Sequence, residues 1–265
     1  MDKLCSVKLS AIHNLVIQES ASGRGEGLLL PRKIMEAADL QDYEQIIITK
    51  IRSGSLDNRI RTIVLGDDFG DSVTVCGSLA QYLSVGDLTC IISETTVDEE
   101  EVSAFENDKW PIFDVGFNPE TNNANHEWLV ELQYCSYKHI CNEPSLFNTA
   151  MQQRQSLRRT RLSSLIMGLK INKTHHDCLH GSAEIPGSVL SAANISQYKS
   201  VSVYNATSGG RAETYAVSMP EGVVMTTGAM ASFAKMGEIV NVATFDISSG
   251  VIVPTICYTD GTCVI

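Results

Sequence analysis

The chain of 265 residues contains two copies of one module, at an offset of about 150 residues. The same residue types occur in the same order in both copies. They are single glycines, a pair of alanines, a tyrosine, an arginine, a threonine and a turn in which glycine precedes an acidic residue. These landmarks are Gly27, Ala37-Ala38, Tyr43, Arg59, Thr62, Gly77 and Val85-Gly86-Asp87 in the first copy, and Gly181, Ala192-Ala193, Tyr198, Arg211, Thr214, Gly228 and Met236-Gly237-Glu238 in the second. A duplicated module predicts two similar units, fused and packed together.

The two copies differ directly after the first repeated glycine. Leu28 follows Gly27 in the first copy, whereas Ser182 follows Gly181 in the second. A leucine side chain has no nucleophilic atom and a serine hydroxyl does. Chemistry at this position is therefore open to the second copy alone.

Composition and charge exclude several classes of protein. The chain is 43% hydrophobic, which is enough for one or two compact cores, and two domains fit its length better. A net charge of -11 argues against nucleic acid or an anionic membrane as partner. No apolar run is long enough to span a bilayer, and Met1-Asp2-Lys3 does not begin a signal pattern, so we expect a cytoplasmic protein.

Three polar features have simple interpretations. The eight cysteines show no CxxC pair and no zinc spacing, so they are expected to be reduced thiols, mostly packed in cores. His175-His176-Asp177 with His180 lacks the spacing of a helical metal site and is interpreted as a solvated loop, so no metal is predicted. The basic cluster is interpreted as a solvated helix face or linker rather than an anion site. It consists of Arg154, Arg158, Arg159 and Arg161.

Short β-branched runs alternate with polar or glycine turns in both copies. They predict strands over 27–30, 45–51, 59–65, 72–76 and 88–92, and again over 200–205, 211–217, 222–226 and 238–245. One short helix, over 32–38, follows Pro31. Many short strands favour a closed barrel, because closure removes exposed edges. The sequence predicts a mainly β protein with two barrels side by side.

The segment between the copies has another composition. It begins with an acidic run over 97–102, interpreted as a helix start or solvated face, and helices are expected over 128–137 and 145–161. The predicted domains are a first barrel with its acidic tail over 1–120, a partly helical connector over 121–160, and a second barrel over 161–265.

The ordered landmarks of the second copy carry a family resemblance. They are Gly181-Ser182, Ala192-Ala193, the run 209–215 (GGRAETY), the run 227–231 (TGAMA) and the run 236–240 (MGEIV). This set resembles the pyruvoyl-dependent aspartate 1-decarboxylases, and the first copy resembles them more weakly, so that the likeness covers roughly two thirds of the chain. The resemblance implies two fused double-psi β-barrels. Family members form tetramers with sites between neighbouring subunits, so a tandem copy implies a homodimer of pseudo-tetrameric arrangement.

The resemblance also implies roles for individual residues. In the family, a serine matching Ser182 attacks the carbonyl of the glycine matching Gly181, and the chain then breaks to leave a pyruvoyl group that serves as electron sink. Thr214 matches a threonine that assists this cleavage, and Tyr215 matches the proton donor in decarboxylation. Arg211 matches the arginine that holds the substrate carboxylate. The substrate-binding residues implied with it are Lys170, Arg59, Thr227, Gly228 and Ala229.

Both copies depart from the family pattern. The first has Ala11, Leu28, Ile63 and Cys76 in place of Lys, Ser, Tyr and Asn, although it keeps His13, Arg59 and Thr62. The second has Asn172 for the family's His and Thr227 for its Asn, and its loop before Ser182 is short. These changes alter the strain on the Gly181–Ser182 peptide, so we expect the chain to remain uncleaved.

Three functions remain open on these grounds. The favoured one is an aspartate-decarboxylase-like accessory enzyme of secondary metabolism, without cofactor, which releases, hydrolyses or cyclises an acyl or polyketide intermediate and meets a polyketide synthase. Ser182 would act with His13, His180 or Lys170 as base, and backbone N–H groups near Gly228 would bind an oxyanion. The alternative is an L-aspartate 1-decarboxylase that makes β-alanine with a pyruvoyl group from Ser182. The third is a scaffold without activity.

Overall fold

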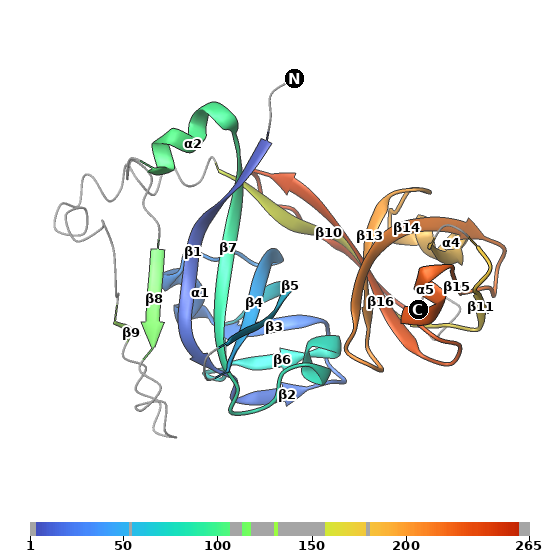
Figure 1. Cartoon of the computed structure of the whole chain (residues 1–265), viewed down its shortest axis with the longest axis horizontal. Helices are drawn as coiled ribbons and strands as arrows, with labels where there is room; N and C mark the ends of the chain where they lie inside the picture. Colours follow the sequence, from blue (N-terminus) through green and yellow to red (C-terminus); the bar gives the residue numbers. More distant parts are fainter. Residues whose placement is uncertain are drawn as a thin grey trace.

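The computed structural model describes residues 4–52, 55–106, 113–117, 130–131, 157–178 and 181–259. The first copy and the second copy each form a small barrel, and the two barrels lie side by side (Figure 1). Within the described residues, no helix is both long and apolar enough to span a bilayer.

The first barrel is built from eight strands and two short helices. Its elements are β1 (Leu4–Val16), β2 (Glu19–Ala21), β3 (Gly27–Pro31), α1 (Arg32–Ala37), β4 (Glu44–Arg52), β5 (Ser55–Asp67), β6 (Thr74–Cys76), the 3-10 helix η1 (Gly77–Gln81), β7 (Leu88–Asp98) and β8 (Phe113–Phe117). After β7 the chain forms α2 (Glu99–Glu106), and β9 (Val130–Glu131) pairs with β8.

The second barrel repeats the same order of elements. They are β10 (Arg158–Lys170), β11 (Lys173–His175), β12 (Ala183–Pro186), α4 (Gly187–Ala192), β13 (Ser200–Asn205), β14 (Arg211–Met219), β15 (Met225–Thr227), α5 (Ala229–Phe233), β16 (Ile239–Ser248) and β17 (Thr255–Tyr258). The expected strands and the helix after Pro31 agree with these elements, apart from their ends.

The strand pairing is the same in both barrels. Parallel pairs β1–β8, β2–β6 and β3–β5 recur as β10–β17, β11–β15 and β12–β14. Antiparallel pairs β1–β7, β4–β5 and β4–β7 recur as β10–β16, β13–β14 and β13–β16. The predicted fold class, mainly β with two fused barrels of one topology, is confirmed.

Each barrel encloses its own apolar core. Leu30, Ile34 and Ile48 lie in the first core, and Ile185, Val189 and Val203 lie at matching places in the second. Burial of these β-branched and leucine side chains is the main force that holds each barrel closed. The polar groups that link the barrels therefore lie outside both cores.

The structure corrects the expected helices of the connector. Residues 158–161 begin strand β10, and Val130–Glu131 is a strand, where helices were predicted. The prediction was wrong because pairing of β10 with β16, and of β9 with β8, overrides local helix propensity. Most of the remaining predicted helical residues lie outside the described part, as does Arg154.

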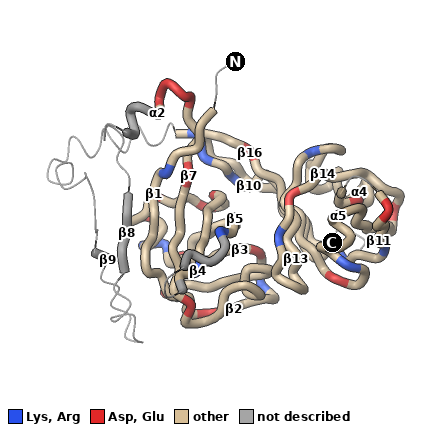
Figure 2. Tube along the Cα trace, in the orientation of Figure 1, with Lys and Arg blue, Asp and Glu red and all other residues tan. Residues whose placement is uncertain are grey.

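Two residues of the basic cluster, Arg159 and Arg161, are buried rather than solvated. Arg159 is 1% exposed and its guanidinium contacts Asp39 at 2.6 Å and Glu44 at 2.8 Å, both in the first barrel. Burial alone would lower the pKa of Arg159, but the charges of Glu44 and Asp39 outweigh it and raise this pKa. Arg161 bonds Gln41 nearby. The interpretation as a solvated face was wrong for both, because the start of β10 lies against β4 and β7 of the first barrel (Figure 2).

Candidate functional site

Ser182 directly precedes strand β12, and its side chain is half-buried among polar side chains. Its Oγ is 2.8 Å from Thr227 Oγ1 and 3.3 Å from Glu184 Oε1, to which it donates. The Ser182 N–H also donates to Thr227 Oγ1, at 3.1 Å. Thr227 reaches this place because β15 runs antiparallel to β12. The hydroxyl therefore has a carboxylate that can accept its proton.

The carbonyl before Ser182 accepts a hydrogen bond from the opposite side. Thr214 Oγ1 on β14 donates to Gly181 O at 2.5 Å. Parallel pairing of β12 with β14 holds these two segments together. A hydroxyl donor at this distance draws electron density from the carbonyl carbon. The structure thus brings Gly181, Ser182, Thr214 and Thr227 together in one cluster.

Backbone N–H groups near Ser182 are mostly used within the fold. Thr227 N donates to Ser182 O at 3.2 Å, and Gly228 N donates to His175 O at 2.9 Å. Ala229 begins α5 and is exposed. The predicted oxyanion group at Gly228 is therefore engaged by a carbonyl in this structure.

Three predicted catalytic side chains stand apart from this cluster. Lys170 is exposed at the end of β10, and Tyr215 is 58% exposed on β14. His13 lies on β1 of the first barrel, with its Nδ1 3.6 Å from Cys90 Sγ. Within the described residues, none of the three forms a hydrogen bond with Ser182. His180, the other predicted base, lies outside the described residues.

Arg211 reaches into the first barrel instead of toward Ser182. Its Nη2 is 3.0 Å from Glu26 Oε1 and 2.9 Å from Ser78 Oγ, and its Nη1 donates to Arg61 O at 2.9 Å. The guanidinium also lies over the Tyr204 ring, 4.5 Å from its centroid. The predicted carboxylate-binding arginine already holds a carboxylate of its own chain.

Glu26 is the centre of this contact between the barrels. Its side chain is 0% exposed and accepts four hydrogen bonds. Besides the Arg211 contact, Ser78 donates from N at 3.0 Å and from Oγ at 2.6 Å, and Asn241 Nδ2 donates at 2.9 Å. A buried carboxylate satisfied by donors from both barrels fixes their relative position.

Comparison with known proteins decides the family. The aspartate decarboxylase family model matches residues 4–110 and again residues 157–260, which together form most of the chain. The chain belongs to the aspartate decarboxylase family.

Several curated relatives are each similar to part of this family member. The aspartate 1-decarboxylase of Clostridium kluyveri is 30% identical over 94 residues, covering 35% of this chain and 71% of the relative. That of Persephonella marina is 33% identical over 97 residues, covering 36% and 67%. That of Methylobacillus flagellatus is 31% identical over 91 residues, covering 34% and 71%. Each relative thus has about the length of one of the two copies in this chain.

In the first copy of this family member, the matching positions are closed by packing. Strand pairing corrects the sequence match, because Gly27 rather than Leu28 lies at the position of Ser182, and Leu28 beside it is 0% exposed in the core. Thr62 Oγ1, which matches the Thr214 hydroxyl, has no hydrogen-bond partner among the described residues. Cys76 is buried, and burial together with the nearby Glu26 charge raises the pKa of its thiol. These features describe a packed protein interior rather than a reactive site. Arg59 is exposed on β5.

Sequence reasoning missed the residues that join the barrels. Glu26 carried a usable signal, since it directly precedes the repeated Gly27, and strand pairing places it where the second copy has Gly181. Ser78, Asn241 and Tyr204 carried none, because their contacts form only when the barrels meet. Among the described residues, no three His, Cys, Asp or Glu side chains gather closely enough to hold a metal ion.

Proposed function

We propose that this aspartate-decarboxylase-like chain remains uncleaved and uses the intact Ser182 hydroxyl on an acyl substrate. The proposed setting is secondary metabolism, where an acyl or polyketide intermediate is released, hydrolysed or closed to a lactone or pyrone. The observation that carries the proposal is the capture of Arg211 by Glu26. The arginine implied to hold the substrate carboxylate is thereby engaged in the barrel contact, and the Ser182 hydroxyl keeps its own acceptor in Glu184.

The proposed chemistry follows from the groups around Ser182. Oγ attacks the carbonyl carbon of a thioester as its proton passes to Glu184, and the carbon–sulfur bond breaks. The departing thiolate takes that proton and leaves as a thiol. Water or a hydroxyl of the substrate then attacks the acyl-serine ester, its proton passes through Glu184, and Ser182 regains it. No cofactor takes part.

One contact favours the alternative, an aspartate 1-decarboxylase with a pyruvoyl group made from Ser182. The Thr214 hydroxyl polarises the Gly181 carbonyl, which is the group that Ser182 would attack in self-cleavage. In that case Tyr215 would donate the proton to the decarboxylated intermediate. A scaffold without activity is the third candidate, and it predicts no effect of changes at Ser182.

The proposal includes partners and a location. The contact within the chain is head-to-tail, since the Glu26 end of the first barrel meets the Arg211 face of the second. A head-to-tail contact between similar units closes only when another copy joins, so we propose a homodimer with four barrels in a ring. His13 of one copy would then lie near Ser182 and Tyr215 of another. A polyketide synthase is the proposed acyl donor, and the cytoplasm is the proposed location.

Intact-mass spectrometry of the purified full chain tests the central claim. One species of 28.9 kDa is expected. Two fragments, the second beginning at residue 182 with a blocked N-terminus, would overturn the proposal and support the decarboxylase. The next measurement is hydrolysis or cyclisation of acyl thioesters by the intact chain.

Ser182→Ala should abolish thioester turnover, while Ser188→Ala, a matched change at an exposed position of α4, should retain it. Equal turnover by the intact chain and Ser182→Ala would contradict the role of Ser182, and the absence of turnover in both would leave only the scaffold. Light scattering tests the assembly separately, and a monomer at working concentration would contradict the ring.

A further inference from the structure

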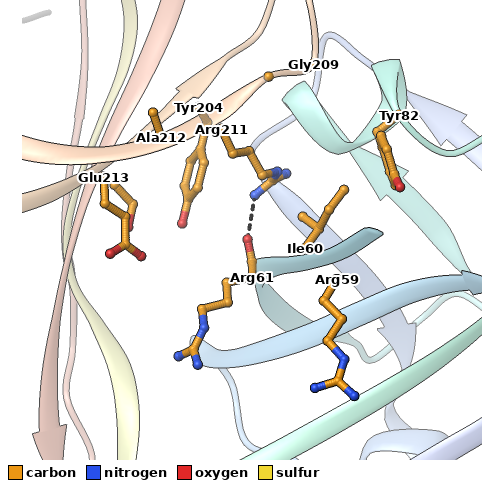
Figure 3. A pocket seen from close by; sticks show the side chains of 11 residues that line it. Arg59, Ile60, Arg61, Tyr82, Tyr204, Gly209, Arg211, Ala212 and Glu213 are labelled. Carbon is orange, nitrogen blue, oxygen red and sulfur yellow. Dashed lines mark hydrogen bonds between the residues drawn. The ribbon is translucent and has the colours of Figure 1, made fainter. Parts of the chain in front are cut away.

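A pocket lies in the seam between the two barrels, away from Ser182. Its volume is about 450 Å³, which falls within the range that accommodates a small organic molecule. Residues 59–61 of β5 form one wall, and residues 209–213 with Tyr204 form the other (Figure 3). The pocket exists only because the second barrel is docked against the first.

Cationic side chains border this pocket on the side of the first barrel. The Arg59 and Arg61 side chains extend in the same direction from β5 (Figure 3). Arg61 is half-exposed and makes long contacts with Gln45 at 3.3 Å and Glu94 at 3.4 Å. Arg59 has no ion pair with a described residue. A carboxylate placed between these two guanidinium groups would gain charge-assisted hydrogen bonds.

The opposite wall holds a buried hydroxyl without a partner. Tyr204 is 2% exposed, and its hydroxyl, which has the Ser202 side chain nearby, forms no hydrogen bond of good geometry with the described residues. Figure 3 shows the ring edge directed into the pocket. A buried polar group of this kind is costly unless a ligand or water satisfies it. Burial raises the pKa of Tyr204, against a smaller lowering by Arg211, so the phenol keeps its proton and can donate.

The remaining lining residues restrict what can bind. Ile60, Tyr82 and Ala212 supply apolar surface for a hydrocarbon body. The Glu213 carboxylate faces the pocket from β14 and disfavours a second negative charge. Arg211 adds little net attraction because Glu26 already neutralises it. We propose that the seam pocket binds a small monocarboxylate with an aromatic or branched apolar body, whose carboxylate contacts Arg59, Arg61 and the Tyr204 hydroxyl.

Titration of the full chain with benzoate, followed by calorimetry, tests this site independently of any activity at Ser182. Binding in the millimolar range is expected, and Tyr204→Phe should weaken it about 10-fold, the effect of losing one hydrogen bond to a charged group. The pair Arg59→Gln with Arg61→Gln should weaken it at least about 30-fold. Lys173→Gln, an exposed change on β11, is the control and should bind as the original chain does.

Thermal unfolding separates loss of binding from loss of fold. Tyr204→Phe removes an unpartnered hydroxyl, so it should be at least as stable as the original chain while binding benzoate more weakly. Unchanged benzoate affinity in Tyr204→Phe, or no binding at about 20 mM benzoate, would overturn the proposal. If inorganic phosphate bound as tightly as benzoate, the pocket would not require an apolar body. If benzyl alcohol bound as tightly as benzoate, the pocket would not require a carboxylate.

Discussion

The repeated-glycine ends of the two barrels differ in backbone conformation and in what surrounds it, because Gly27 has a positive φ and Gly181 does not. At the first end, Leu28 enters the core and Glu26 fastens the second barrel. At the second end, Ser182 stays half-buried beside Thr227 and Glu184. Strand pairing places Gly27 at the position of Ser182 and Glu26 at the position of Gly181. The first copy has thus turned this place into an internal contact, and the second has kept a hydroxyl there. Duplication allows this division, because one copy can supply the contact between the barrels while the other keeps the hydroxyl.

The same comparison explains which donors remain useful. Thr214 donates to the Gly181 carbonyl, whereas the matching Thr62 hydroxyl is buried without a partner among the described residues. The threonine persists in the first barrel although its hydrogen bond does not. A retained landmark in the sequence therefore does not show that its interaction is retained.

The largest expected difference lies in the glycines themselves. Gly27 has φ +111°, and a Cβ there would meet the Ile63 carbonyl oxygen, whereas a Cβ on Gly181 would lie 3.3 Å from Met230. Gly27→Ala should lower the free energy of unfolding by about 3–5 kcal/mol, and Gly181→Ala by about 1 kcal/mol. Urea unfolding followed by circular dichroism measures both. Equal losses would show that the two ends are under the same backbone constraint.

The two threonines should respond to valine with opposite signs. Thr62→Val removes a buried, unpartnered hydroxyl at nearly constant shape and should leave stability unchanged or raise it by up to about 1 kcal/mol. Thr214→Val leaves Gly181 O without its donor and should lower stability by about 1 kcal/mol. Parallel urea curves of the two variants give the answer. A loss in Thr62→Val as large as in Thr214→Val would mean that Thr62 has a partner in solution.

The smallest effect concerns the turns before the last long strand of each barrel. The Lys235 N–H bonds the Glu238 carboxylate at 2.8 Å and lowers its pKa, with further help from Asn205. A lowered pKa stabilises the fold above the ordinary pKa of glutamate, and this contribution is lost as the pH falls through the folded value. Glu238→Gln should therefore cost about 0.5 kcal/mol at pH 7 after solvent screening, and nothing in strong acid.

Urea unfolding at several pH values checks the Glu238 prediction. Glu36→Gln, an exposed change on α1 of the first barrel, serves as the control and should show the same stability difference at every pH. A cost of Glu238→Gln that stays constant down to strong acid would contradict the assigned role of the carboxylate.

Much of the fold could be predicted from the sequence, because the repeat and the β-branched runs are local properties. The strands over 45–51 and 200–205 and the helix after Pro31 are near their expected places. The start of β10 could not be predicted, since its helix-compatible residues become a strand only by pairing with β16. The cluster of Gly181, Ser182, Thr214 and Thr227 followed from the family landmarks. The separation of Lys170, Tyr215 and His13 from that cluster did not.

The order of residues alone determined the doubling of the module, its family and the restriction of hydroxyl chemistry to Ser182. Each of these depends on the identity of a side chain at one position in the chain. Only the tertiary structure decided that Arg211 binds Glu26 and that Arg159 is buried against Asp39 and Glu44. The physical reason is that a charged side chain, once another surface covers it and excludes water, pairs with an opposite charge on that surface. That surface exists here only after the two barrels have folded and met.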